Sequence, residues 1–116
     1  MKISDILSED DFIFSLCTFI DEFKLDDDKQ TLVAEEPMDD LLHTSRCILA
    51  GAAEKLSNDY GITPPAWVKK EIYYLKHPIY AFDTQNLEFR EHLRKNTPIE
   101  FASRNIFYGE NVLSRV

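Results

Sequence analysis

Residues 38–60 read MDDLLHTSRCILAGAAEKLSNDY and form the longest stretch of helical periodicity in this chain. Apolar residues recur on one side of the expected helix at intervals of three and four, namely Leu41, Ile48, Leu49, Ala52, Leu56 and Tyr60. Gly51 lies among alanines, and this run of small side chains lets a neighbour approach closely, at a cost of about 1 kcal/mol in helix propensity. Gly61 is well suited to a left-handed C-cap. The stretch therefore predicts a closely packed helix that ends at Tyr60.

On its N-terminal side, a helix is expected over residues 9–24. Ser8 and Asp11 have the spacing of a capping box. A broad apolar face follows at helical spacing, made of Phe12, Ile13, Leu16, Cys17, Phe19, Ile20 and Phe23. The acidic connector over 25–37 predicts a loop or a single turn. We expect the helices over 9–24 and 38–60 to pack antiparallel.

On its C-terminal side, Thr63 and the prolines after it predict a third helix that reaches Leu75, since a capping residue followed by proline favours a helix start. Residues 87–95 predict a short basic helix, and 97–104 a further short helix that opens in the same way. Residues 105–116 fit a turn around Gly109 followed by a final helical turn, and a strand is the alternative for residues 106–108. Together these elements predict an all-α fold: a compact bundle of four to six helices with an irregular C-terminal segment, in a single domain over 1–116.

The charge of the chain is unevenly distributed. Residues 1–45 hold 13 acidic and 3 basic side chains, whereas residues 46–116 hold 8 acidic and 10 basic ones. An acidic front half repels nucleic acid and favours a basic partner, while the back half is able to contact an anionic one. The alternative interpretation is a solvated acidic surface that serves solubility.

The N-terminal sequence argues against export. Glu9, Asp10 and Asp11 fall where a signal peptide needs its apolar stretch. No window approaches the roughly 18 apolar residues that span a bilayer. We therefore expect a cytoplasmic protein without membrane association, in which Cys17 and Cys47 are buried small hydrophobic side chains rather than disulfide partners.

The sequence offers little that resembles a catalytic or metal centre. His43 and Cys47 are four residues apart and could bind zinc together with Cys17, but no second closely spaced pair supplies the remaining ligands. A cysteine nucleophile needs an electropositive pocket, whereas both cysteines lie in apolar stretches. The three glycines are too far apart to form a phosphate-binding loop. We expect no catalytic centre, no metal and no cofactor.

The C-terminal residues 97–116 read TPIEFASRNIFYGENVLSRV. This tail resembles the C-terminal signature of a group of small bacterial proteins, in which a Trp-containing helix precedes an ending of the form Thr/Ser-Pro-x-x-Phe-x-x-Arg-Asn-Ile-Phe. Trp67 stands in a suitable place for that helix. Members of the group resemble the small partner encoded beside a nucleotidyltransferase-like toxin. The resemblance implies an antitoxin-like protein whose partner is the product of an adjacent gene.

The expected function is non-enzymatic binding of another protein. The sequence leaves open which protein this is and what the oligomeric state is. The expected partner-binding residues are Trp67, Arg90, Arg94, Phe101, Arg104, Asn105, Phe107 and Arg115. The apolar members are anchors, and the arginines are donors suited to carboxylates or phosphates. The alternative is that the anchors pack on this protein's own helices and the arginines pair with its own acids.

Two other functions stay open at this point. A nucleic-acid-binding regulator would use the basic side chains Arg90, Arg94, Lys95 and Arg104, although acidic residues interrupt them and make nucleic acid the weaker candidate. The third candidate is a protein with a small-molecule or metal site.

Overall fold

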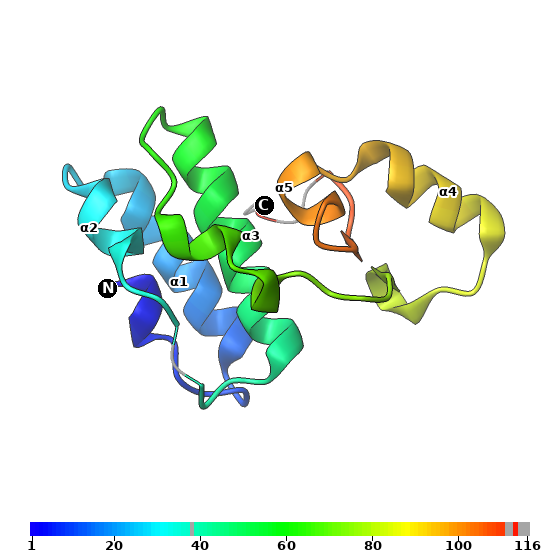
Figure 1. The fold of residues 1–116 in the computed structure, drawn as a ribbon, viewed down its shortest axis with the longest axis horizontal. Helices are drawn as coiled ribbons and strands as arrows, with labels where there is room; N and C mark the ends of the chain where they lie inside the picture. Colours follow the sequence, from blue (N-terminus) through cyan, green and yellow to red (C-terminus); the bar gives the residue numbers. More distant parts are fainter. Residues whose placement is uncertain (38, 111–112, 114–116) are drawn as a thin grey trace.

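Helix α3 (His43–Asp59) lies at the centre of the molecule, and other elements pack around it (Figure 1). This arrangement is seen in a computed structural model that describes residues 1–37, 39–110 and 113. Within those residues the other α-helices are α1 (Phe12–Leu25), α2 (Lys29–Ala34), α4 (Leu87–Asn96) and α5 (Ile99–Ala102). The chain also forms 3-10 helices over Ile3–Asp5, Ala66–Lys69, Glu71–Tyr73 and Ala81–Asp83, and the strands β1 (Ile79–Tyr80) and β2 (Ile106–Phe107). The fold is therefore mostly helical, as predicted, but the two strands mean that it is not purely all-α.

Helix α3 is buried on almost every side in its middle. Its buried residues include Cys47, Leu49, Ala50, Gly51, Ala52, Ala53, Leu56 and Ser57. Helix α5 and the 3-10 helices Ala66–Lys69 and Glu71–Tyr73 pack against it. At Gly51 an added Cβ would lie 2.8 Å from two ring carbons of Phe101, so the two elements are as close as a glycine allows. The predicted role of Gly51 in close packing is confirmed, with α5 as the neighbour.

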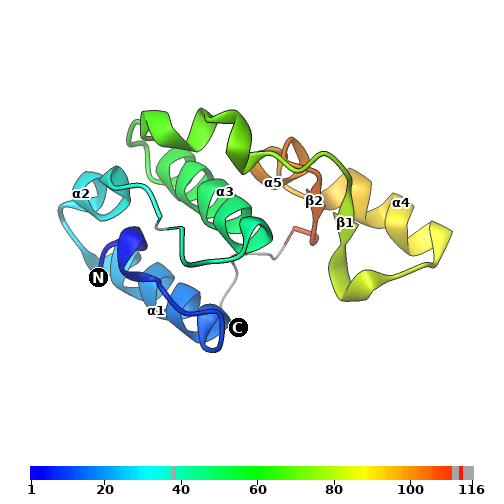
Figure 2. The ribbon, with the colours of Figure 1, turned by 60° about the horizontal axis from the view of Figure 1, so that its bottom comes forward.

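Helices α1 and α3 run in the same direction, so the expectation of an antiparallel pair is wrong (Figures 1 and 2). Their C-terminal ends meet where the Phe23 and Tyr60 rings pack edge to face with centroids 5.5 Å apart. Near their N-terminal ends, the Leu42 N–H donates a hydrogen bond of 3.3 Å to the Glu9 carboxylate. The two helices run in the same direction because α2 and the chain after it lead back to the N-terminal end of α1, where α3 begins.

The connector was expected to be a loop or a single turn, yet it contains the six-residue helix α2. Leu32 and Val33, its two large apolar residues, are buried in the main core. These contacts give a short helix within an acidic connector enough buried surface to stay helical, which the composition of the connector did not indicate.

The helix ends agree only partly with the signals in the sequence. The predicted capping box does not form, because Ser8 Oγ accepts a hydrogen bond from the Asp10 N–H, and α1 begins at Phe12. Helix α3 begins at His43 rather than at Met38, which lies outside the described residues. Its C-terminal end is as predicted. Gly61 has a φ of 70°, and the N–H groups of residues 61 and 62 donate to the carbonyls of residues 58 and 57 in a Schellman motif.

The predicted third helix over 63–75 is wrong. The segment instead forms two 3-10 helices separated by Lys70, whose extended backbone (ψ 140°) interrupts the helix. Two aromatic side chains fix this shape. The Trp67 Nε1–H donates to the Val33 carbonyl at 2.8 Å, and the Tyr73 hydroxyl donates to Glu36 at 2.5 Å. Both rings are thus anchored to the connector, and they hold the segment in this two-part form.

The C-terminal third of the chain contains the predicted basic helix as α4 and the short helix as α5. Thr97 does not cap α5, because its hydroxyl donates to the Leu93 carbonyl at 2.7 Å. Strand β2 confirms the strand alternative for this region. It pairs in parallel with β1, with Ile79 opposite Ile106 and Tyr80 opposite Phe107 (Figure 2).

Replacing Gly51 by alanine is expected to destabilise the protein, although alanine is the better helix former. The new methyl group meets the fully buried Phe101 ring. Overpacking of this kind costs about 1–3 kcal/mol of unfolding free energy, which outweighs the gain of about 1 kcal/mol in helix propensity. Urea denaturation of Gly51→Ala, and of Gly51→Ala with Phe101→Leu, measures the effect. A single variant more stable than the parent would contradict the close packing.

Candidate functional site

Residues 79–96 project from the main body, and we call this segment the arm (Figures 1 and 2). It consists of β1, the 3-10 helix Ala81–Asp83, a loop and α4. The arm makes the molecule elongated, with principal extents of 41 × 28 × 26 Å. Helix α4 packs mainly against β2, so most of its surface is left to solvent.

The base of the arm is a stack of two aromatic rings and two arginines. The Tyr80 and Phe107 rings, which are opposite each other in the strand pair, stack with centroids 5.5 Å apart and an interplanar angle of 22°. The guanidinium carbons of Arg90 and Arg94 lie 4.5 and 5.4 Å from the Tyr80 ring centroid. Each such cation–π contact is worth about 0.5–1 kcal/mol where it is partly exposed. The stack holds α4 to the strands.

Local sequence explains how α4 presents its arginines. The Asn86 side chain accepts a hydrogen bond of 2.9 Å from the Phe89 N–H and so caps the helix. Because Arg90 and Arg94 are four residues apart, they share one helix face. Arg90 Nε also donates to the Thr84 carbonyl at 2.7 Å, which ties the preceding loop to the helix. The loop and the start of α4 therefore form one unit.

Residues 81–87 of the arm, which we call its tip, carry exposed apolar side chains on a strained backbone. Phe82 and Asp83 have φ values of 59° and 51°, in the left-handed region, where a residue other than glycine costs roughly 1–2 kcal/mol. The Phe82 side chain is nevertheless 93% exposed, and Leu87 is 78% exposed. Backbone strain of this kind occurs preferentially at functional sites. The tip is thus a candidate contact surface.

In contrast to the exposed side chains of the arm, Arg104 is completely buried. Its Nη1 donates to Glu54 Oε1 at 2.7 Å and to the Glu100 carbonyl at 2.6 Å, and its Nη2 donates to the Val68 carbonyl at 2.6 Å. The guanidinium also lies 4.6 Å from the Tyr74 ring centroid. Arg104 therefore joins the tail to α3 and to the 3-10 helices.

Glu54 is the counterion of Arg104 and is itself buried. Burial alone would raise the pKa of Glu54, but hydrogen bonds from Lys69 and Arg104, together with their charges, hold that pKa below its ordinary value of 4.5. The carboxylate is thus ionised at neutral pH and bridges a buried cation and the exposed Lys69.

Several of the predicted partner-binding residues serve the fold instead. Trp67 and Phe101 belong to the core, and Arg104 is buried as described. Asn105 adopts a φ of 64°, and its side-chain amide donates to the Leu75 carbonyl at 2.7 Å. These four side chains are taken up by contacts within the chain, which corresponds to the alternative weighed from the sequence.

The structure brings the other predicted residues together at the arm. Arg90 and Phe107 are half-buried in the stack, and Arg94 is exposed beside them. Arg115 lies outside the described residues. Sequence reasoning missed Tyr80 and Phe82. Strand pairing places Tyr80 in the stack, and no glycine marks the left-handed turn at Phe82, so neither had a local signal.

His43 and Cys47 do lie close together, but their arrangement is not that of a catalytic pair. His43 Nε2 is 2.5 Å and Cys47 Sγ 3.7 Å from the Ile72 carbonyl oxygen, so both groups are directed at an acceptor. Burial raises the pKa of Cys47, which keeps it a thiol. Within the described part of the chain, no three His, Cys, Asp or Glu side chains gather in a way that would hold a metal ion.

Comparison of this chain with family models, with curated proteins and with solved structures found no match. None of the helices in residues 1–37 and 39–110 has both the length and the apolar character that crossing a bilayer requires. Function is therefore inferred from the geometry of the chain itself.

Breaking the buried ion pair is expected to change both stability and its dependence on pH. Glu54→Gln leaves Arg104 without its counterion, which typically costs about 3–5 kcal/mol of unfolding free energy. Because the folded-state pKa of Glu54 is depressed, its contribution is present above about pH 4.5 and is lost as the pH falls further. Urea titrations from pH 7 to pH 3 should therefore show a smaller difference between parent and variant at the acid end.

The matched control is Glu35→Gln, because Glu35 pairs with Lys2 on an exposed surface. This change should leave stability at pH 7 nearly unaltered. Equal losses in the two variants would show that the Glu54 pair does not hold the fold together.

The two free cysteines should differ in their reaction with a thiol reagent such as DTNB. Cys17 is half-buried, whereas Cys47 is completely buried and its pKa is raised. In a Cys17→Ser variant, the remaining thiol should react only after denaturation. Rapid native-state reaction of Cys47, with Cys47→Ser as the control, would contradict its placement.

Proposed function

We propose that this chain is a non-enzymatic protein-binding module whose main contact is the tip of the arm. The observation that carries the proposal is Phe82, a large aromatic side chain that is 93% exposed on a left-handed backbone. Folding alone would favour a small or polar residue there. A partner that buries the ring gives the strained conformation a use.

The composition of the arm suits a protein interface. Binding energy at interfaces concentrates in aromatic and arginine side chains surrounded by apolar contacts. Here Phe82 and Leu87 are exposed, and Arg94 is accessible beside the Tyr80 stack. Because hydrogen bonds to α4 hold the loop, little conformational freedom would be lost on binding.

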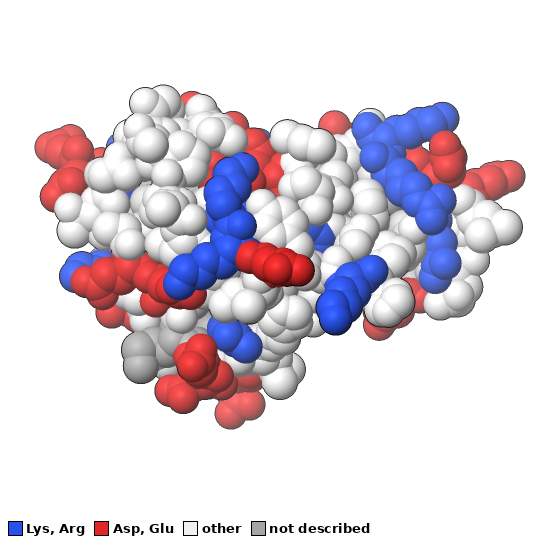
Figure 3. Space-filling view, in the orientation of Figure 1, with Lys and Arg blue, Asp and Glu red and all other residues white. Residues whose placement is uncertain are grey.

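A protein partner is favoured over nucleic acid. Lys and Arg side chains do form a stripe over α4 (Figure 3). However, Arg90 is committed to the Thr84 carbonyl, and the Glu91 carboxylate lies 3.9 Å from Arg94 and 3.7 Å from Lys95. These internal acceptors weaken the attraction of the stripe for phosphates. Binding of DNA or RNA whose affinity falls as the salt concentration rises would instead support the nucleic-acid-binding regulator.

The resemblance of the tail to antitoxin-like proteins suggests which partner to test. We propose that the chain neutralises a nucleotidyltransferase-type toxin encoded by an adjacent gene. Since Phe101 and Arg104 are buried within the chain, the arm makes the contact in place of those two tail residues. The acidic residues of the first 45 positions offer a second surface for a basic nucleotide site.

Phe82→Gly tests the contact without damaging the fold. Glycine accepts a positive φ freely, so relief of strain offsets its higher entropy in the unfolded state, and the unfolding free energy should change by no more than about 1 kcal/mol. Loss of the ring should weaken binding to the adjacent gene's product by about 30-fold or more, the effect of a residue that contributes about 2 kcal/mol. Isothermal titration calorimetry measures the affinity.

The control for this experiment is Phe14→Ser on α1, which removes another exposed aromatic side chain from a different surface. It should bind as the parent does. If Phe14→Ser weakens binding and Phe82→Gly does not, the contact lies on the acidic front half. Equal growth inhibition by the adjacent gene's product with and without this chain would contradict the antitoxin-like role.

A further inference from the structure

A pocket of about 680 Å³ lies between the N-terminal end of α3 and the segment that leads from the Glu71–Tyr73 helix to β1. This volume is within the range of about 300–1,000 Å³ typical of small-molecule sites. Neither the stack nor the tip of the arm contributes to its lining. The pocket is therefore a separate feature from the proposed protein-binding surface.

One part of the pocket wall is apolar. Ile72, Leu75 and Ile79 line it, and Ile72 is 50% exposed. An isoleucine exposed to that extent beside other apolar side chains gains by contact with an apolar ligand, which removes its surface from water. The pocket can therefore hold an apolar body.

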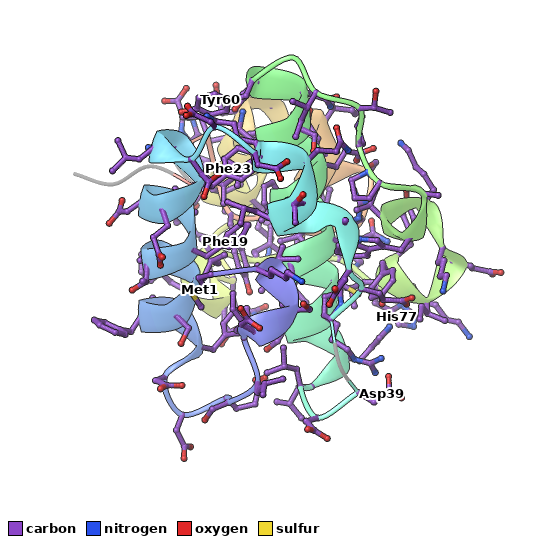
Figure 4. The ribbon with its side chains drawn as sticks, turned by 90° about the vertical axis from the view of Figure 1, so that its left-hand side faces the viewer. Met1, Phe19, Phe23, Asp39, Tyr60 and His77 are labelled. Atoms are coloured by element: carbon purple, nitrogen blue, oxygen red, sulfur yellow. The ribbon has the colours of Figure 1, made fainter. Side chains whose placement is uncertain are left out.

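The charged part of the wall is predominantly cationic, although the whole chain carries a net charge of −8. Arg46 and Lys76 line the pocket, and Glu71 is the one carboxylate among the described lining residues. In Figure 4, the labelled His77 and Asp39 lie toward the same edge of the molecule. A positively charged rim on an acidic protein favours an anionic ligand.

Arg46 is incompletely satisfied by the chain itself. Its Nη1 pairs with Asp39 at 3.2 Å, but the Asp39 side chain is 96% exposed, so this ion pair is weak. Its Nε is buried and makes no hydrogen bond to any part of the chain that the structure describes. A buried donor without an acceptor costs roughly 1–3 kcal/mol. The charge of Arg46 also acts on the Glu36 carboxylate. A ligand carboxylate in the pocket can add a stronger counterion than the exposed Asp39.

The N-terminal end of α3 contributes less to anion binding than its position suggests. His43 and Thr44 of its first turn line the pocket. However, the Glu9 carboxylate already accepts hydrogen bonds from the Leu42 N–H and the Ser45 hydroxyl at that end. The cationic side chains, rather than the helix end, therefore decide the charge of the ligand.

We propose that this pocket binds a small amphipathic carboxylate, with its apolar body against Ile72, Leu75 and Ile79 and its carboxylate toward Arg46 and Lys76. The body is the size of a medium-chain acyl or aryl group. Both halves of the ligand are needed, because the apolar wall supplies most of the binding energy and the cations select the head group.

Three probes with the same apolar chain test the proposal on the intact protein: octanoate, octanol and octylammonium. Titrations followed by two-dimensional amide NMR should show saturable shifts at residues 72–79 with octanoate. The affinity for octylammonium should be at least about tenfold lower than that for octanoate, and the affinity for octanol should lie between the two. Equal affinity for the three probes, or shifts confined to other regions, would overturn the proposal.

Two variants locate the site. Lys76→Glu should weaken octanoate binding about tenfold and reduce the preference of the protein for octanoate over octylammonium. Ile72→Asp should weaken the binding of all three probes. Both positions are exposed, so the amide spectra should stay those of a folded chain. Lys95→Glu on α4 makes the same charge change outside the pocket and should leave octanoate binding unaltered. If Lys95→Glu and Lys76→Glu act alike, only net charge matters and the pocket is not the site.

Discussion

The buried ion pair of Glu54 and Arg104 is the interaction on which the rest of the structure depends. It joins the middle of α3 to the tail, and the same guanidinium reaches the Val68 carbonyl in the 3-10 segment. Three stretches of chain that are distant in sequence are thereby fixed around one charge. Removing two charges from water is costly, so the pair is best understood as fixing one arrangement of these segments rather than as adding much net stability.

Much of the fold could be predicted where the signal was local. Helix α3 follows from its apolar periodicity, and Gly61 marks the end of α3 because its φ of 70° is what a Schellman motif requires. The errors came from long-range contacts. Trp67 and Tyr73 bind residues 34 and 37 positions earlier, which overrides the helix that the prolines favoured. The parallel direction of α1 and α3 likewise depends on where the connector leads the chain, and no local pattern in the connector indicates this.

The candidate site could be predicted only in part. Arg90 and Arg94 share a helix face by their spacing alone, but the ring they cover reaches them through strand pairing. Arg104 had the same chemistry in the sequence as those two, and only its distant counterion separates a structural arginine from accessible ones. The resulting division is clear. Most of the tail motif builds the interior, while the arm and the pocket beside α3 present the chemistry that faces outward.

The 50-residue separation within the buried pair also sets an order of events during synthesis. Glu54 is translated long before Arg104, and at about 5–20 residues per second the delay is roughly 3–10 s. Until then, α3 has neither its counterion nor the Phe101 ring that covers Gly51. The nascent chain therefore exposes the apolar surface of its central helix for seconds, and exposed surface of this kind is prone to aggregation. Folding is completed only when the tail arrives.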